Sequence, residues 1–433
     1  MHEVSLRGFI KVLEERDEVL SWNSSVSVKY DISRILKKYD EGPALIFPYV
    51  KDYEINVVGN TISKRSRLIW ASGATNDIDL YLRLLKACNQ PLRANVYSDA
   101  PFMESRLKSL YELPILLHYE RDGGPYITSG IVVARDPETD FQNASFHRMM
   151  VIDDRHLAIR IVPRHLYRIH EKYKERRKDT PVAIMIGTHP LVMLSAASSP
   201  PYGVNELYVA NRLVENRLEL TTLPDSGLEV TRYSEIIIEG RILKDAFHDE
   251  GPFVDITGTY DIVRKQPVVE VDRIFLREGG MYQALLPASS EHRILMGFFR
   301  EALIWSYASR VAEVKAVRLT KGGCGWLHCV ISVKKTTEGD AKNVILAAFA
   351  AHPSLKMVIV VDDDVNVDDP FDVEWAIATR FQADKDLVII ERVRGSSLDP
   401  SANQRTLLTA KLGIDATRTL EKPYKDFEKA RIP

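Results

Sequence analysis

The chain has few cysteines and no long apolar runs. Its three cysteines, Cys88, Cys324 and Cys329, cannot build a disulfide framework, and two of them alone cannot close a zinc site. This usage favours a reducing compartment, so we predict a cytoplasmic protein. The first residues place charges where a secretory signal needs an apolar region, and no window approaches ~18 uninterrupted apolar residues. We therefore expect no membrane segment.

The chain also lacks an excess of either charge and the common hydrolase motifs. Its 58 basic and 60 acidic residues give a net charge of −2, so we expect no nucleic-acid or membrane partner. Neither a serine-nucleophile elbow nor His-Glu-x-x-His occurs. The acidic run at residues 362–369 lacks the glycine and glutamate that a calcium loop needs, with Val367 and Val373 in their places. It predicts a turn that caps the next helix, with Asp369 or Asp372 as N-cap.

The composition and length predict a globular protein of two or three domains. The chain has 433 residues, of which 45% are hydrophobic and 27% charged. In residues 1–112 we expect an N-terminal α/β domain, because helical and strand-like patterns alternate there. Ser5 is the predicted N-cap of the first helix. The expected helices cover residues 6–13, 31–39 and 77–88, and the expected strands cover residues 18–20, 43–47 and 53–59.

From residue 113 to 290 the apolar period shifts to two, which predicts a β-rich central barrel. We expect a helical insertion at residues 191–216 and strands at residues 127–134, 146–152, 156–162, 235–240 and 268–275. Residues 291–433 return to alternation and predict a C-terminal α/β domain whose last ~20 residues form an exposed docking arm. Its expected helices cover residues 292–307, 341–352 and 373–381, and its expected strands cover residues 327–333 and 356–361. The predicted fold class is thus α+β with several domains.

Two sets of polar residues in the central region suggest chemistry. Asn143, His165 and Glu206 supply an amide oxygen, an imidazole and a carboxylate, a mixed set that suits Mn²⁺ or Mg²⁺ better than a closed zinc site. Each residue also has a structural interpretation, since Asn143 at a strand entrance is also able to cap a turn. The two interpretations stay open at this point.

The second set is Glu250, Asp255 and Arg148. A Gly-Pro pair follows Glu250 and lets the chain bend, so that both carboxylates face one cavity. Close carboxylates raise each other's pKa, and one then holds a proton while an arginine keeps the other ionised. The alternative is two exposed loop acids. Arg148 follows Asn143 by five residues in a strand with alternating polarity, so the two share a face only if Asn143 belongs to the preceding turn.

These residues, in this order, resemble the UbiD family of prenylated-flavin-dependent decarboxylases. The resemblance rests on Asn-Ala-Ser-Phe-His-Arg at residues 143–148 with His165, Asn-Glu-Leu-Tyr at residues 205–208, and Glu-Gly-Pro-Phe-Val-Asp-Ile-Thr-Gly at residues 250–258. Residues 358–366, 375–380 and 411–417 are also similar to that family. The likeness spans nearly the whole chain and implies a UbiD-like fold with a central split-barrel flavin-binding domain.

The resemblance implies a role for each polar residue. Asn143, His165 and Glu206 are expected to bind Mn²⁺ or Mg²⁺ against the phosphate of prenylated FMN, with K⁺ nearby. Arg148, Glu250 and Asp255 are expected to form the catalytic network, in which Glu250 protonates the carbon that loses CO₂ and the cofactor serves as electron sink. The expected cofactor-binding residues are Asn143, Ser145, Phe146, His147, Arg148, Arg160, Ile161, Val162, His165 and Glu206. A flavin prenyltransferase is the expected cofactor supplier, and a homo-oligomer, dimer or hexamer, is the expected assembly.

The expected reaction is reversible decarboxylation of an α,β-unsaturated acid. Compact family members include archaeal enzymes of the trans-anhydromevalonate phosphate decarboxylase type, which serve isoprenoid synthesis, and we predict trans-anhydromevalonate 5-phosphate as substrate. Its phosphate requires cations, for which His147, Arg164 and Arg168 are candidates. The alternatives are an aromatic-acid decarboxylase of the 4-hydroxybenzoate type, an FMN-binding reductase and a non-catalytic family member. Many relatives follow the metal-binding histidine with Arg-Gly-Gly, whereas this chain has Leu-Tyr-Arg after His165.

Overall fold

The structure is a computed structural model that describes residues 3–430 and residue 432. The chain forms two compact units, Met1–Leu295 and Met296–Pro433. In the described part of the chain, no helix has the length and apolar character needed to cross a membrane.

The N-terminal part of the first unit is a small mixed sheet with helices. Ser5 caps the first helix, because its hydroxyl accepts a hydrogen bond from the amide of Gly8 at 2.9 Å, as predicted. The sheet order is β1-β2-β3-β18, so the last strand comes from much later in the chain. The strands are β1 (Val19–Ser21), β2 (Ala44–Phe47), β3 (Asn56–Gly59) and β18 (Met281–Gln283), and the helices are α1 (Leu6–Glu14), α2 (Asp31–Lys38), α3 (Arg65–Ser72) and α4 (Asp77–Asn89).

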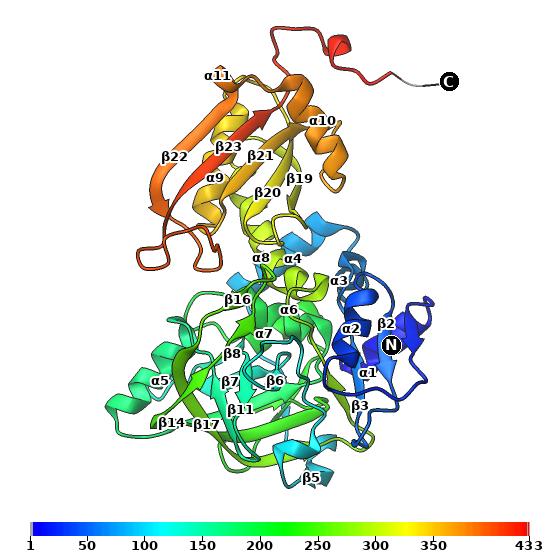
Figure 1. The fold of residues 1–433 in the computed structure, drawn as a ribbon, viewed down its shortest axis with the longest axis vertical. Coiled ribbons are helices and arrows are strands. Elements are labelled where there is room, and N and C mark those ends of the chain that lie inside the picture. Colours follow the sequence, from blue (N-terminus) through cyan, green and yellow to red (C-terminus); the bar gives the residue numbers. More distant parts are fainter. Residues whose placement is uncertain (1–2, 431, 433) are drawn as a thin grey trace. The chain divides into compact units, whose positions relative to one another are not determined.

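The centre of the first unit is a nine-stranded antiparallel sheet that curls into a half-barrel (Figure 1). Its order is β6-β9-β10-β17-β14-β11-β7-β8, with β5 also pairing with β17. Register shifts between the long strands β14 and β17 increase the local bend. The strands are β5 (Ser105–Leu107), β6 (Tyr126–Ile127), β7 (Ile131–Arg135), β8 (Gln142–Phe146), β9 (Met149–Val151), β10 (His156–Ile159), β11 (Thr180–Ile186), β14 (Ile236–Glu250) and β17 (Arg264–Leu276).

Helices and short sheets cover this half-barrel. Helix α5 packs on β11 and β14, whereas α6 and α7 lie against β8. The helices are α5 (His165–Glu175), α6 (Pro190–Ser198) and α7 (Glu206–Leu213), with short 3₁₀ turns at η1 (Pro101–Glu104) and η2 (Leu110–Glu112). The remaining strands are β4 (Asn95–Tyr97), β12 (Glu219–Thr222) and β13 (Glu229–Thr231) in one sheet, and β15 (Phe253–Val254) and β16 (Tyr260–Asp261) in a hairpin.

One hydrophobic core joins the small sheet to the half-barrel. Leu45 and Phe47 of β2 belong to the same buried cluster as Val132 of β7 and Ile184 of β11. Burial of this shared apolar surface explains why residues 1–295 form one compact unit. The predicted division near residue 112 stays a prediction.

The second unit is a five-stranded sheet with helices on both faces. On β21, Val358 and Val360 pack in the cluster that contains α9, while Ile359 and Val361 pack in the cluster that contains α10. This alternation follows from the two-residue period of a strand. The order is β19-β20-β21-β23-β22. The elements are β19 (Glu313–Leu319), β20 (His328–Lys334), β21 (Met357–Asp362), β22 (Leu387–Arg394), β23 (Leu408–Ala416), α9 (Asp340–Ala351), α10 (Pro370–Arg380), α11 (Ala383–Asp386) and η3 (Tyr424–Asp426).

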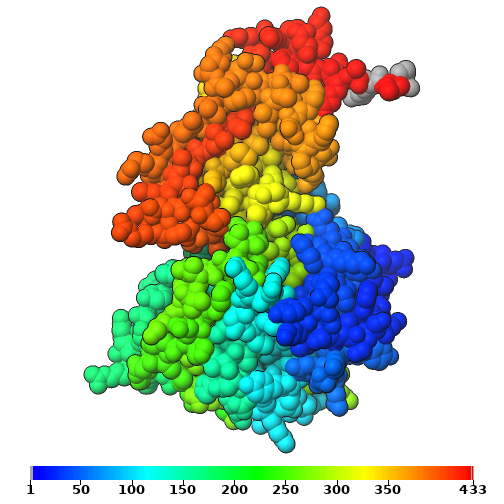
Figure 2. Space-filling view, in the orientation of Figure 1, coloured from blue at the N-terminus to red at the C-terminus, as the bar shows by residue number. Residues whose placement is uncertain are grey.

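Helix α8 (Ser290–Ala308) begins in the first unit and ends in the second. The acidic run after β21 forms a turn, and Asp369 caps α10 by accepting a hydrogen bond from the amide of Phe371 at 3.0 Å, as predicted. Asp362 and Asp364 of the same run bind Arg380 at 2.6 and 2.8 Å. The last described residues run over the surface of the second unit, in red in Figure 2, and most are exposed.

Candidate active site

The three predicted metal ligands lie together in the first unit. Asn143 Nδ2 donates to Glu206 Oε1 at 2.8 Å, and His165 Nδ1 lies 3.8 Å from the same oxygen. Glu206 Oε2 accepts from the main-chain N–H of Ala144 at 2.8 Å. Asn205 caps α7 and thereby places Glu206 at its first residue, where the helix dipole favours a negative charge. Glu206 is 1% exposed, so burial raises its pKa, while the neighbouring His165 and Ala144 N–H oppose that rise.

The hydrogen-bond donors around the side-chain oxygen of Asn143 leave it with an unused lone pair. His147 Nδ1 lies 2.9 Å from the carbonyl of Arg160, which only accepts, so Nδ1 carries the hydrogen. Burial lowers the pKa of His147 to about 4, so the ring is neutral at neutral pH and its Nε2 must accept. Ser145 Oγ, 3.0 Å from that Nε2, gives it its only proton. Ser145 Oγ also lies 3.0 Å from Asn143 Oδ1, and this amide oxygen, which has two lone pairs, keeps at least one that is able to face a cation.

The donor set fits a hard divalent cation. It combines an amide oxygen, an imidazole and a buried carboxylate, and His165 is the sole basic side chain within ion-pair distance of Glu206 among the described residues. The same part of the chain contains no group of three or more His, Cys, Asp or Glu residues that could hold a metal ion. A metal site here therefore depends on the amide oxygen of Asn143.

The aromatic ring of Tyr202 packs against the ring of His165. The rings of His165 and Tyr202 meet edge to face, with centroids 5.3 Å apart. Tyr202 donates a hydrogen bond to Asp136, whose carboxylate also binds Lys172 at 2.6 Å. The guanidinium of Arg168 stacks 4.1 Å above the Tyr202 ring. The Leu-Tyr-Arg segment that follows His165 thus supplies a cation, Arg168, that packs on the neighbour of His165.

Arg148 binds three carboxylates at once. Its Nε and Nη2 donate to Glu250 at 2.8 and 3.0 Å, its Nη1 donates to Asp255 at 3.3 Å, and its Nη2 also reaches Asp261 at 3.0 Å. Burial alone would lower the pKa of Arg148, but the ion pairs raise it well above its usual value. The ring of Phe253 lies 4.9 Å from the guanidinium carbon. The arginine is therefore permanently charged and fixed in orientation.

The bend at Gly251 brings the two predicted acids to this arginine. Gly251 has φ +108°, a conformation that side-chain-bearing residues rarely adopt, between Glu250 at the end of β14 and the hairpin that carries Asp255. Glu250 is fully buried, while the side chain of Asp255 is 23% exposed. The two are not exposed loop acids, and the bend was predicted correctly.

The sequence prediction for Asn143 and Arg148 was wrong in one respect. A single strand was expected at residues 146–152, on which Arg148 shares a face with Asn143 only if Asn143 belongs to the preceding turn. Instead, Asn143 lies inside β8, and the strand is interrupted at His147 and Arg148 before β9 begins at Met149. Because the chain is not extended across this interruption, the alternation rule does not apply there, and both side chains reach their sites.

The predicted flavin-lining segments flank the same interruption. The main-chain N–H of Arg160 donates to the carbonyl of Arg148 at 3.0 Å, and that of Ile161 donates to the side chain of Gln266 at 2.9 Å. Ile161 is buried, but Val162 is 38% exposed. These contacts hold residues 160–162 beside residues 147–148. Their contact with a cofactor stays a prediction.

Several residues around Arg148 were missed by the sequence analysis. Asp261 shares the hairpin with Asp255, and Tyr126 donates its hydroxyl to Glu250 Oε1 at 3.1 Å. Burial raises the pKa of Asp122 to about 6 and lowers that of His118 to about 3. Both ring nitrogens of His118 lack a hydrogen-bond partner among the described residues. Only Asp261 had a sequence signal, because the turn Thr-Gly-Thr at residues 257–259 indicates a hairpin that returns it to Asp255.

Comparison with protein-family models matches almost the whole chain. Residues 10–88 match the 3-octaprenyl-4-hydroxybenzoate carboxy-lyase N-terminal domain, residues 94–290 match the Rift-related domain of the same family, named UbiD, and residues 293–416 match its C-terminal domain. The three matches follow one another without overlap.

Individual relatives are similar over the same length. The chain is 44% identical over 421 residues to the anhydromevalonate phosphate decarboxylase of Methanothermobacter thermautotrophicus, covering 97% of this chain and 98% of that protein. It is 45% identical to the protein of the same name from Methanocaldococcus jannaschii, covering 94% and 95%. Among solved structures, the UbiD-class enzyme HmfF from Pelotomaculum thermopropionicum in complex with FMN has a TM-score of 0.96 at 36% identity, covering 99% of this chain and 97% of that chain. An evolved dimeric form of HmfF with prenylated FMN has a TM-score of 0.92 at 34% identity, covering 100% and 97%.

Proposed function

Because the chain belongs to the UbiD family, we propose that it is a prenylated-FMN-dependent decarboxylase of trans-anhydromevalonate 5-phosphate in isoprenoid biosynthesis. The observation that carries the proposal is the buried Glu250, held by Arg148 in the same unit as the Asn143, His165 and Glu206 set. The substrate follows from the name shared by the two archaeal relatives at 44% and 45% identity. The flavin follows from the solved HmfF structures with FMN and prenylated FMN.

Asn143, His165 and Glu206 would hold a divalent metal, Mn²⁺ or Mg²⁺, with K⁺ nearby. The spare lone pair of Asn143 Oδ1 and the buried carboxylate of Glu206 support this assignment, because both are able to bind a cation. A cation held there would neutralise the negative charge of the flavin phosphate in a closed site. Ser145, Phe146 and the main chain of residues 160–162 then line the flavin.

When bound, the prenylated flavin supplies an electron sink for loss of CO₂. Glu250 supplies the proton that the product carbon needs, and Tyr126 and Arg148 orient its carboxyl group. Arg148 keeps two further carboxylates, those of Asp255 and Asp261. For that reason Glu250 is able to take up a proton without leaving the buried guanidinium unpaired. This arrangement suits a group that alternates between acid and base.

We propose a cytoplasmic homo-oligomer, dimer or hexamer, that receives its cofactor from a flavin prenyltransferase. A dimeric form of HmfF supports an oligomer. The three cysteines are free thiols, in keeping with a reducing compartment.

The test is purification after co-expression with a flavin prenyltransferase, followed by a visible spectrum, elemental analysis and an assay of CO₂ release. We expect flavin absorption, bound Mn²⁺ and turnover of the phosphorylated enoic acid. Uptake of neither flavin nor metal would contradict the proposal. Turnover of 4-hydroxybenzoate alone would retain the decarboxylase and replace its substrate.

A further inference from the structure

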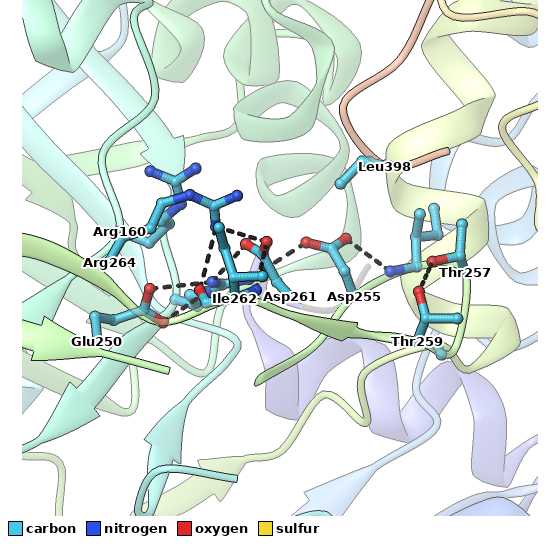
Figure 3. Close-up of polar contacts among 12 residues, drawn as sticks. Arg160, Glu250, Asp255, Thr257, Thr259, Asp261, Ile262, Arg264 and Leu398 are labelled. Atoms are coloured by element: carbon cyan, nitrogen blue, oxygen red, sulfur yellow. Dashed lines mark hydrogen bonds and ion pairs between the residues drawn. The ribbon is translucent and has the colours of Figure 1, made fainter. Parts of the chain in front are cut away.

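We propose that the guanidinium groups of Arg160 and Arg264 form a subsite for the phosphate of the substrate. This inference rests on the proposed function and names the residues that would recognise its phosphorylated acid. The subsite lies beside Glu250 and Asp261, and Figure 3 shows both arginine side chains extending in the same direction next to Asp261.

Two neighbouring strands bring the arginines together. Arg160 directly follows β10, and Arg264 is the first residue of β17, which pairs with β10. Arg264 is also the register partner of Glu250 in the β14–β17 ladder. The subsite is therefore built on the same strand pair that carries the proposed proton donor.

Arg160 carries a charge that no direct ion pair compensates. In the described part of the chain it forms no ion pair with a carboxylate, and its side chain donates one long hydrogen bond, to the carbonyl of Ile161 at 3.4 Å. Burial lowers its pKa, and repulsion from Arg264 and Arg148 lowers it further, while the carboxylates of Asp261 and Glu250, beyond ion-pair distance, offset only part of this effect. A half-buried guanidinium beside two others is unfavourable unless an anion joins them.

Arg264 has donors left over as well. It binds Asp261 at 2.5 Å and the carbonyl of Ile262 at 3.3 Å, both through Nη1. Asp261 is itself shared with Arg148. A guanidinium has five N–H donors in a planar fork, so most of those of Arg160 and Arg264 remain available. Two such forks match the geometry of a phosphate dianion.

The cations first expected to hold this phosphate are neutral, stacked on an aromatic ring or next to the proposed metal site. His147 is neutral at neutral pH because burial lowers its pKa to about 4. Arg168 stacks on Tyr202, and Arg164 adjoins the proposed metal ligand His165 and reaches Ser199 at 3.4 Å. Arg160 and Arg264 are instead next to the acid that must protonate the reacting carbon. A phosphate held there would fix the far end of a short substrate and select it over unphosphorylated acids.

The test compares the phosphorylated enoic acid with its dephosphorylated alcohol in Arg160→Gln, Arg264→Gln and Arg264→Lys. We expect the ratio of the two kcat/KM values to fall about 100-fold in both glutamine variants, mainly through KM, because each removes charge-assisted bonds to phosphate. Arg264→Lys keeps the positive charge but loses the paired N–H donors of the guanidinium, so the ratio of the two kcat/KM values should fall less in this variant. Arg155→Gln, in the exposed turn between β9 and β10, is the matched control and should leave the ratio unchanged.

Calorimetric titration with the phosphorylated enoic acid gives a second measurement that does not depend on turnover. Loss of binding in the two glutamine variants supports the subsite even if no CO₂ is released, and in that case only the proposed reaction fails. If both variants bind like the wild type, or lose both substrates equally, the arginines do not recognise phosphate and the subsite is wrong.

Discussion

Replacement of Glu250 by glutamine tests the centre of the proposed mechanism. Glu250 is fully buried and receives two hydrogen bonds from Arg148 and one from Tyr126. Glutamine has nearly the same shape, but it carries no titratable proton. The variant therefore separates proton supply from architecture.

The expected loss follows from these contacts. Removal of a positioned general acid lowers kcat by about 10²- to 10⁴-fold. The structural cost is smaller, because Arg148 retains Asp255 and Asp261 and the glutamine oxygen still accepts one of its bonds. We expect a stability loss of about 1–3 kcal/mol, the penalty for one imperfectly matched buried polar group.

The assay measures CO₂ release, flavin content and thermal unfolding of Glu250→Gln in parallel. Tyr126→Phe is the matched control, because it removes one hydrogen bond to the same oxygen and leaves the carboxyl group in place. We expect this variant to lower the rate of CO₂ release by about 3- to 10-fold. Turnover of Glu250→Gln within about tenfold of the wild type would refute the assignment of Glu250 as proton donor. Loss of flavin from the variant would instead show that Glu250 is needed for the architecture.

Four further substitutions test other parts of the structure. Glu206→Ala should lose bound metal and weaken flavin retention, and unchanged Mn²⁺ by elemental analysis would exclude Glu206 as a ligand. Burial raises the pKa of Asp122 to about 6, so the folded protein favours the protonated carboxyl group. The contribution of this group to folding stability is full below pH ~4 and is lost as the pH rises through 6. Urea unfolding should therefore show that the free energy of unfolding of Asp122→Asn rises by about 1–2 kcal/mol relative to the wild type between pH ~4 and ~7. Gly251→Ala places a side chain at φ +108° and should cost about 1–3 kcal/mol together with most activity, measured by thermal unfolding and turnover. Arg380→Gln removes the ion pair of the buried Asp362, which then keeps only the main-chain N–H of Arg418 among its described donors, and calorimetry should show a loss of stability of about 3–5 kcal/mol.

Local patterns predicted many of the elements. Ser5, Asp369 and the helix that begins at Asp77 follow from capping residues and apolar spacing, which act over a few neighbouring residues. Helix α5 was missed because few of its residues are apolar, with Leu166 and Ile169 buried in a mostly charged sequence. Its position is fixed by packing on the central sheet rather than by its own periodicity.

Only some residues of the site were predicted from the sequence, for the same reason. Asn143, Glu206 and Arg148 belong to recognisable motifs, and the structure brings their partners to them. Tyr126 and Arg264 stand alone in the sequence, and they join the site only because the strand order places β6, β14 and β17 within one sheet. No spacing rule finds contacts between residues more than a hundred positions apart, such as Tyr126 and Glu250.

The short segment from Asn143 to Arg148 has a consequence for motion. It carries a proposed metal ligand at one end and the arginine of the proton-handling network at the other, joined by only five peptide bonds inside the first unit. A displacement of the two units would leave the spacing between these groups unchanged. The alignment of the proposed anchoring and reacting groups is therefore set within the first unit alone.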